Sequence, residues 1–438
     1  MSKHIVIIGA SAAGLAAATR IKKESPDSRV TIIDKDANMP YRRPSITGII
    51  EGTLNLSDIA IYSREIEPLG IKLLRGFKVS KIIPSKSAIR VVSPDGSEDI
   101  INYDSLIIAT GAEARFPSVE GSDLNGVFII RKAEDAIKIS KYLEQSRKVA
   151  VVGAAFVALL VTEALVRRGL KTYLIIRSRV LRRLVGQSAS EVIEKYLQSG
   201  GVIPVKGVTV SKIVGDKKVE KISLSDGSTI NVDCLIFAIG ANPETELASE
   251  AGIKTEHGII DVDRYMETSV SGIYAAGDCS FSWDFITKSK VYNPIASIAS
   301  SSGEIAGLNA IDKHVEAPYS LRFQYEKILG LEIITAGYTY EECKKLEIPA
   351  EYKDLSEEIK EQYPLWRSRI LKMDVVTRGK GEILGFQIIG RENTRMFAPP
   401  FLSAMLEGLK LEDALKLLNA PIPSLTSLPM PYKKTLFR

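Results

Sequence analysis

A chain of 438 residues is too long for a single hydrophobic core, so its length predicts two or three domains. Hydrophobic residues make up 45% of the sequence and charged residues 25%, which is typical of a globular protein and excludes a disordered or fibrous one. The net charge of +5 is small for this length and does not favour binding to nucleic acid.

Metal, thiol and membrane functions have little support in the composition. The three cysteines, Cys234, Cys279 and Cys343, lie far apart and form neither a disulfide framework nor a metal-ligand set. Only three histidines are present, so we expect no metal site. No apolar run approaches the length of about eighteen residues that a membrane span requires. The apolar run at residues 5–9 is too short for a signal peptide, so the sequence indicates a cytoplasmic protein.

The N-terminal stretch has the order of a dinucleotide-binding βαβ unit. Residues 4–8 are apolar and β-branched without alternation, as in a strand that is buried on both faces. The small-residue turn 9–14 leads into an Ala-rich helix at 15–23, and a second strand at 29–33 ends on Asp34. This order of strand, turn, helix, strand and acid predicts a bound dinucleotide.

Each part of this unit has a physical role in holding a dinucleotide. Gly9 forms the tight turn, and Gly14 lets the helix and strand pack closely. The N-terminus of the helix supplies free N–H groups for a phosphate. Asp34 lies about twenty residues further on and is able to accept hydrogen bonds from ribose hydroxyls. Ser11 stands where the second glycine of the pattern is usual.

A mixed region follows the first unit. Residues 39–48 are rich in proline, glycine and charge and predict a loop that opens into a short helix. Residues 78–83 and 87–92 predict paired strands, and a turn leads from them to residues 99–103. Residues 105–111 predict another buried strand that ends on small residues.

The pattern of the first unit then returns. Residues 148–152 predict a strand, residues 153–158 a small-residue turn and residues 159–168 a helix. The next strand, at residues 171–176, ends on Arg177. One βαβ unit holds one dinucleotide, so the repeat predicts a second dinucleotide site.

Two features of the second unit bear on its ligand. Ala155 stands at the second glycine of the turn, where a methyl group would meet the approaching pyrophosphate. The arginines Arg177, Arg179, Arg182 and Arg183 follow the strand where an acid is usual in NAD-binding units. An acid would repel a 2′-phosphate and arginines attract it, so the sequence favours NADPH over NADH. The alternative interpretation of the arginines is a solvated basic loop.

The chain returns to β structure after the second unit. Residues 208–232 are β-rich, and residues 234–240 repeat the buried strand with its small-residue end. A short strand at 271–278 ends on Gly277-Asp278, and a small-residue helix follows at 293–310. The composition changes near residue 324, and the last region contains predicted strands at 332–337, 370–377 and 383–390 and helices near 398–408 and 411–419.

This order of elements resembles the pyridine nucleotide–disulfide oxidoreductases, a family of flavoproteins that bind two dinucleotides. The resemblance extends over nearly the whole chain, and residues 383–390 are similar to the family's dimerisation domain. The motifs on which the resemblance rests are Gly9 to Gly14 with Asp34, residues 109–111, residues 153–158, residues 238–240 and residues 275–278.

The resemblance implies an α/β fold with two Rossmann-like dinucleotide-binding domains and a C-terminal α+β dimerisation domain. It places the FAD-binding domain at residues 1–113 and 244–323, the NAD(P)H-binding domain at residues 114–243 and the C-terminal domain at residues 324–438. The cofactors that it implies are FAD and either NADPH or NADH.

The resemblance also implies which residues bind the cofactors. For FAD these are Gly9, Ser11, Ala12, Ala13, Gly14, Asp34, Lys35, Arg43, Val79, Ala109, Thr110, Gly111, Gly277 and Asp278. For the nicotinamide nucleotide they are Gly153, Ala155, Phe156, Val157, Arg177, Arg182 and Gly240. No catalytic side chain and no metal ligand is expected, because hydride passes from nicotinamide to flavin without a protein nucleophile.

Residues 41–46 place the chain within the family. In the branch of CoA-disulfide reductases and water-forming NADH oxidases, a redox cysteine lies in this stretch. Aligned through Ile46, that cysteine falls on Pro44, and the Tyr-x-Arg-Pro pattern instead resembles rubredoxin-reductase-like flavoproteins. Glutathione-reductase-like members carry a His–Glu dyad near the C-terminus, and the similar stretch at residues 422–427 has neither residue.

The sequence therefore predicts an FAD-dependent NAD(P)H oxidoreductase that passes electrons to a small molecule or a redox protein without a redox cysteine. One alternative is a CoA-disulfide or persulfide reductase or an NADH oxidase. Another is a catalytically weak flavin-binding paralogue, because Leu160 replaces a glutamate that many members carry near the nicotinamide. Residues 397–401 and 425–432 are apolar and Pro-rich, and a lone domain would expose them, so we expect a homodimer.

Overall fold

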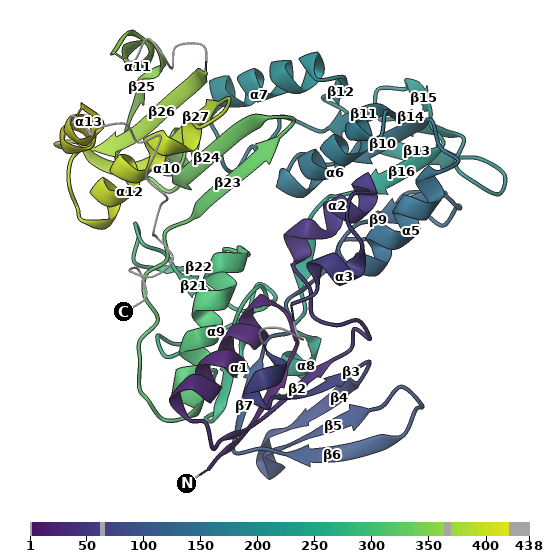
Figure 1. The fold of residues 1–438 in the computed structure, drawn as a ribbon, viewed down its shortest axis with the longest axis vertical. Coiled ribbons are helices and arrows are strands. Elements are labelled where there is room, and N and C mark those ends of the chain that lie inside the picture. Colours follow the sequence, from purple (N-terminus) through teal and green to yellow (C-terminus); the bar gives the residue numbers. More distant parts are fainter. Residues whose placement is uncertain (1, 62–65, 363–368, 420–438) are drawn as a thin grey trace. The chain divides into compact units, whose positions relative to one another are not determined.

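The first part of the chain is built on two separate parallel five-stranded sheets (Figure 1). The computed structural model describes residues 2–61, 66–362 and 369–419. The chain divides into two compact units, Met1–Leu329 and Gly330–Arg438, and both parallel sheets belong to the first.

The first sheet forms around the N-terminal strand, in the order β20-β7-β1-β2-β3, with all neighbours parallel. Its central strand is buried along nearly its whole length, which explains the uninterrupted apolar run in the sequence. The strands are β1 (His4–Ile8), β2 (Arg29–Asp34), β3 (Lys72–Arg75), β7 (Ser105–Ile108) and β20 (Ile273–Ala275), and helix α1 (Ala12–Glu24) connects β1 to β2.

The second sheet repeats this arrangement in the order β12-β11-β10-β16-β9, again with all neighbours parallel. The predicted α/β fold with two Rossmann-like units is therefore confirmed. The strands are β9 (Val127–Ile129), β10 (Lys148–Val152), β11 (Lys171–Ile176), β12 (Val202–Lys206) and β16 (Cys234–Phe237); α6 (Phe156–Arg167) connects β10 to β11, and α7 (Gln187–Ser199) connects β11 to β12.

Smaller elements make up the rest of the first unit, Met1–Leu329. Strands β8 (Ala112–Ala114) and β17 (Ala241–Pro243) pair antiparallel where the chain passes from one sheet to the other and back. The predicted pairing of β4 (Lys78–Ile83) with β5 (Ala88–Val92) is confirmed. The remaining elements are β6 (Glu98–Asn102), β13 (Val210–Val214), β14 (Lys221–Leu224), β15 (Thr229–Asn231), β18 (Thr255–Glu256), β19 (Ile259–Ile260), β21 (Ser282–Trp283), β22 (Lys290–Val291), β23 (Phe323–Ile328), α2 (Ile46–Glu51), α3 (Leu56–Ile59), α5 (Ala133–Leu143), α8 (Glu246–Glu250), α9 (Ala296–Ala310), η1 (Arg43–Ser45), η2 (Glu67–Leu69) and η3 (Pro84–Lys86).

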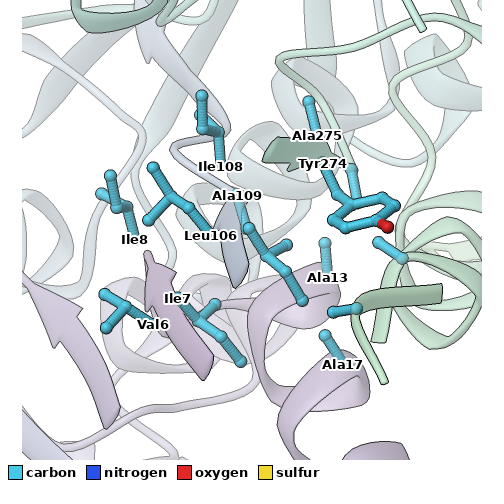
Figure 2. Close-up of a cluster of buried hydrophobic side chains, with 14 of the residues drawn as sticks. Val6, Ile7, Ile8, Ala13, Ala17, Leu106, Ile108, Ala109, Tyr274 and Ala275 are labelled. Carbon is cyan, nitrogen blue, oxygen red and sulfur yellow. The ribbon is translucent and has the colours of Figure 1, made fainter. Parts of the chain in front are cut away.

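Helices α1 and α9 pack closely because their contact is made of small residues (Figure 1). A Cβ at Gly303 of α9 would lie 2.2 Å from the carbonyl oxygen of Ala13, and one at Gly307 would lie 2.7 Å from that of Ala17. Ala13 and Ala17 belong to the buried cluster on which the first sheet rests. Figure 2 shows part of this cluster, with side chains from β1, β7 and the start of α1.

The second unit is built on an antiparallel sheet in which β24 pairs with β27, β27 with β26 and β26 with β25. The rings of Phe386 and Phe401 lie 5.5 Å apart in its core. The elements are β24 (Leu331–Gly337), α10 (Tyr340–Lys345), β25 (Glu351–Asp354), α11 (Ser356–Gln362), β26 (Ile370–Arg378), β27 (Glu382–Gly390), η5 (Thr394–Phe397), α12 (Ala398–Leu406) and α13 (Leu411–Asn419).

The expectation that residues 397–401 form an exposed apolar patch is wrong. Phe397 is 6% exposed and Phe401 is fully buried, because this segment packs against β27 within its own unit. The second stretch of that prediction, residues 425–432, lies outside the described residues. The expected domain limits at residues 113, 243 and 323 remain predictions.

No helix in the described part of the chain combines the length and the apolar character that crossing a membrane requires.

The contact between α1 and α9 makes a testable prediction about stability. Gly303→Ala places a methyl group against the backbone of α1, and such overpacking should cost about 1–3 kcal/mol of unfolding free energy. Ser301→Ala, on the same helix and only partly buried, should stay within about 0.5 kcal/mol of the wild type. Denaturant unfolding measures both, and equal stability of the two variants would contradict this packing.

Candidate functional site

The first candidate site lies where β1 and β7 end side by side, at the point where the strand order reverses. In open parallel sheets, ligands bind at the carboxyl ends of the strands at such a point. Gly9 follows β1 with a φ of +108°, and a Cβ there would lie 2.2 Å from the carbonyl oxygen of Ala109, which follows β7. A Cβ at Gly14 would lie 1.9 Å from the carbonyl oxygen of Gly9. The backbone of the turn is therefore closed to any side chain at these two positions.

A cavity of about 610 Å³ opens beside this turn. Eight of the residues that the sequence assigned to FAD line it: Gly9, Ser11, Asp34, Lys35, Arg43, Val79, Ala109 and Thr110. Ala12, Ala13, Gly14, Gly111, Gly277 and Asp278 do not line it. The remaining lining residues are Ile8, Ala10, Ile33, Asp36, Phe77, Lys78, Ser80, Ala112, Glu113, Lys132, Glu244, Glu246, Leu247 and Glu250.

Asp34 holds the shape of the turn from the end of β2. One carboxylate oxygen accepts a hydrogen bond from the N–H of Ala10 at 2.6 Å, and the other accepts one from the N–H of Asp36 at 2.8 Å. A carboxylate has about four lone-pair sites, so acceptor capacity remains for ribose hydroxyls in the cavity. The acid that the sequence assigned to ribose is thus also a structural part of the turn.

An ion network that the sequence did not reveal lies at the edge of this cavity. Nζ of Lys35 lies 2.6 Å from a carboxylate oxygen of Glu113 and 2.7 Å from one of Glu244, and Lys132 also pairs with Glu113 at 3.2 Å. Burial opposes the charge of Lys35, but the two carboxylates outweigh it and raise the pKa of this lysine above its ordinary value. Glu113 is the middle residue of β8 and Glu244 directly follows β17, so Lys35 ties both crossing segments to the end of β2.

Gly277 and Asp278 lie next to the first turn of α1. A Cβ at Gly277 would lie 2.9 Å from that of Ala13. The carboxylate of Asp278 pairs with the guanidinium of Arg131 at 3.0 Å, and Nε of Arg131 donates to the carbonyl of Ala112 at 3.0 Å. The sequence analysis did not identify Arg131 as part of this site, because no motif surrounds it and its partner Asp278 lies 147 residues away in the chain.

The turn of the second unit has the same construction as the first. A Cβ at Gly153 would lie 2.4 Å from the carbonyl oxygen of Ala238, which follows β16. Ala155 precedes α6 in extended conformation, with φ −91° and ψ 171°, so its backbone does not require glycine. Val157 is 47% exposed on the first turn of α6, whereas Phe156 is buried. Gly240 follows β16 with a φ of +96°.

The loop after β11 forms a smaller pocket of about 200 Å³. Of the two arginines assigned to the nucleotide, Arg182 lines this pocket, and Arg177 is exposed without lining it. Arg179 lines the pocket as well and donates to the carbonyl of Val185 at 2.5 Å. The other lining residues are Ser178, Gln187, Glu191, Glu194 and Lys206.

None of the three cysteines lines either cavity, and all three are buried. Burial raises the pKa of Cys234 and that of Cys279, which keeps both as thiols. Pro44 lies in the short 3₁₀ turn that precedes α2. The stretch at residues 422–427, which resembles the His–Glu dyad segment, lies outside the described residues. In the described part of the chain, no group of His, Cys, Asp and Glu side chains is arranged to hold a metal.

Comparisons with known proteins agree with this construction. The family model for pyridine nucleotide-disulphide oxidoreductases matches residues 3–303. An NADH oxidase of Methanocaldococcus jannaschii is 35% identical over 399 residues, which cover 88% of this chain and 87% of that protein. A CoA-dependent NAD(P)H sulfur oxidoreductase of Pyrococcus furiosus is 32% identical over 396 residues, which cover 89% and 88%.

Two further similarities involve different acceptors. A rubredoxin-NAD(+) reductase of Ectopseudomonas oleovorans is 33% identical over 282 residues, which cover 63% of this chain and 71% of that protein. The solved structure of an NAD-dependent persulfide reductase from A. fulgidus superimposes with a TM-score of 0.86 at 26% identity, covering 96% of this chain and 79% of that one.

The geometry of the first turn predicts what controls FAD binding. Gly9→Ala forces a methyl group into the carbonyl of Ala109, so the purified variant should be colourless, whereas the wild type should be yellow with noncovalent FAD. Gly96→Ala is the control, because Gly96 also has positive φ but no atom within 4 Å, and it should bind FAD fully while losing about 1 kcal/mol of stability. Absorbance and released FAD measure both. A yellow Gly9→Ala variant would contradict the role of this turn.

Proposed function

The chain belongs to the pyridine nucleotide-disulphide oxidoreductase family, and we propose that within it this protein transfers electrons to its acceptor without a redox-active cysteine. It is an FAD-dependent oxidoreductase that uses NAD(P)H. Bound FAD supplies the hydride-accepting chemistry. The chain's own contribution is to bind and orient the two dinucleotides: the turn from Gly9 to Gly14 with Asp34 would hold FAD, and the turn at Gly153 would hold the nicotinamide nucleotide.

One observation carries the proposal: the position that aligns with the family's redox cysteine is Pro44, and the chain offers no replacement. Cys234 lies inside β16, Cys279 follows Asp278, and Cys343 lies on α10 in the second unit. The thiol of Cys279 donates to the carbonyls of Ile108 and Ala276 at 3.5 and 3.3 Å, so its contacts are with the backbone of the sheet. A buried thiol with a raised pKa is a poor nucleophile.

Two other functions have specific support. The Pyrococcus furiosus relative is a CoA-dependent sulfur oxidoreductase, which favours disulfide, persulfide or polysulfide chemistry for this chain. Proline at position 44 opposes that function, because it has no sulfur to form a mixed disulfide. A catalytically weak paralogue is favoured by Leu160 and Ala155, although the extended backbone of Ala155 is compatible with alanine.

For the acceptor, we propose a small molecule or a redox protein. Relatives include an NADH oxidase and a rubredoxin reductase, so related chains use both kinds of acceptor. For the nucleotide, we propose that NADPH is preferred over NADH. The support for this preference is that Arg179 and Arg182 line one pocket directly after β11, where a 2′-phosphate would be attracted.

Removal of all three cysteines tests the thiol-free mechanism. A variant with Cys234, Cys279 and Cys343 all changed to Ala should keep its NADPH-driven reduction of an artificial acceptor within about threefold, a change of less than about 1 kcal/mol in barrier. Alanine is used because the three sites are buried and a serine hydroxyl would need a partner. The variant's FAD content is the control for folding. A variant that binds FAD and loses turnover would show that a thiol takes part.

Replacement of the pocket arginine tests the nucleotide preference. Arg182→Ala should reduce the preference for NADPH by about tenfold, because an exposed hydrogen bond to a phosphate is worth about 1.5 kcal/mol. Arg183→Ala, an exposed neighbour that does not line the pocket, is the matched control and should keep the preference. Anaerobic flavin reduction by NADPH and NADH measures both. Equal effects of the two variants would identify the arginines as general surface charge.

A further prediction concerns the oligomeric state. We propose a homodimer formed through the second unit, where Leu406, Leu409 and Leu417 are 52%, 39% and 43% exposed around α12 and α13. Sedimentation at micromolar concentration should give the mass of two chains. Leu406→Lys with Leu417→Lys should shift the protein towards the monomer, and a wild type that is monomeric under these conditions would refute the proposal.

A further inference from the structure

The loop after β11 is held in an unfavourable backbone conformation. Leu181 is 2% exposed with a φ of +50°, in the left-handed region that is unfavourable for a non-glycine residue. Such a residue persists only where its surroundings fix it. Its N–H donates to the carbonyl of Ala154 at 2.7 Å, and its carbonyl accepts from the N–H groups of Leu184 and Val185 at 2.7 and 3.0 Å. The loop is therefore tied directly to the turn of the second βαβ unit.

The other attachment of this loop comes from the buried face of α7. Oε1 of Glu194 accepts a hydrogen bond from the N–H of Val180 at 3.2 Å, and Oγ of Ser190 donates to the carbonyl of Val180 at 2.8 Å. The backbone N–H and the carbonyl of Val180 are thus both held by side chains of α7. Val180 and Leu181 are adjacent, so this clamp fixes the strained residue and the arginines on each side of it.

Glu194 is also a buried acid within a pocket that is otherwise suited to an anion. Its side chain is 6% exposed, and its second oxygen pairs with Nζ of Lys206 at 2.5 Å. Lys206 offsets the charge of Glu194, so Arg179 and Arg182 both contribute positive charge to the pocket. Glu191 lines the same pocket one turn away on α7, but it is exposed and accepts from Gln187 at 2.7 Å.

We propose that Glu194 is the positioning residue for nucleotide selectivity: by clamping Val180, it places Arg179 and Arg182 to bind the 2′-phosphate of NADPH. The inference rests on the proposed preference for NADPH and adds the residue that makes the preference depend on loop geometry. The clamp acts at the adenosine end of the nucleotide, so it should change affinity for NADPH and leave the hydride-transfer rate unchanged.

The experiment is anaerobic stopped-flow reduction of the FAD-loaded protein by NADPH and by NADH. Glu194→Ala should raise the apparent Kd for NADPH about tenfold, the equivalent of losing one hydrogen bond to a charged group, while the Kd for NADH changes less than about twofold. The limiting rate of flavin reduction should stay at the wild-type value for both nucleotides. Glu194→Gln keeps an oxygen for Val180 and should restore most of the NADPH affinity.

Glu191→Ala is the matched control, because it removes the same charge from the same pocket at a side chain that accepts from Gln187 of its own helix, and it should not weaken NADPH binding. An equal loss of affinity in Glu191→Ala and Glu194→Ala, or an equal loss for NADH and NADPH, would overturn the positioning role.

If Glu194→Ala does not fold, Ser190→Ala opens the other half of the clamp and should give the same NADPH-specific loss of affinity. A wild type with equal Kd values would overturn the cofactor preference itself, whereas a preference that survives in Glu194→Ala would overturn only the role of Glu194.

Discussion

The close approach of a glycine to a carbonyl oxygen at the reversal point of each sheet is the constraint on which this structure depends. Gly9 meets the carbonyl of Ala109, and Gly153 meets that of Ala238, at separations that exclude a side chain in both cases. Two neighbouring parallel strands end at each of these points, and the chain turns there into a helix whose N-terminus faces a ligand. The identical contact in both sheets explains why two dinucleotides are bound by one chain.

The charges around the two sites differ, and the difference supports the proposed preference for NADPH. At the first site, acids dominate the cavity, and Lys35 joins Glu113 and Glu244 at the crossings between the sheets. At the second site, the end of β11 carries arginines, and the buried acid beneath them is offset by Lys206. The first arrangement suits ribose hydroxyls, and the second suits an additional phosphate.

The sequence predicted those features whose signals are local. The strand at residues 4–8, the glycine turns and the repeat at residues 148–176 depend on neighbours within a few residues, and the structure contains all of them. Arg131 with Asp278, and Lys35 with Glu244, are separated by 147 and 209 residues, and ion pairs at such separations leave no pattern in a single sequence. The prediction of an exposed patch at residues 397–401 was wrong. The sequence of that segment does not show that the ring of Phe386 packs against Phe401 and covers it.

The electron capacity of the protein tests the central claim most directly. Anaerobic titration with dithionite measures how many electrons the purified protein takes up per FAD, with spectra recorded throughout. A flavin that works without a redox cysteine should be fully reduced by two electrons, and no long-wavelength charge-transfer band should form. Uptake of four electrons per FAD would show an oxidised cysteine that is reduced along with the flavin, and the band would show a thiolate beside it; either result would contradict the account.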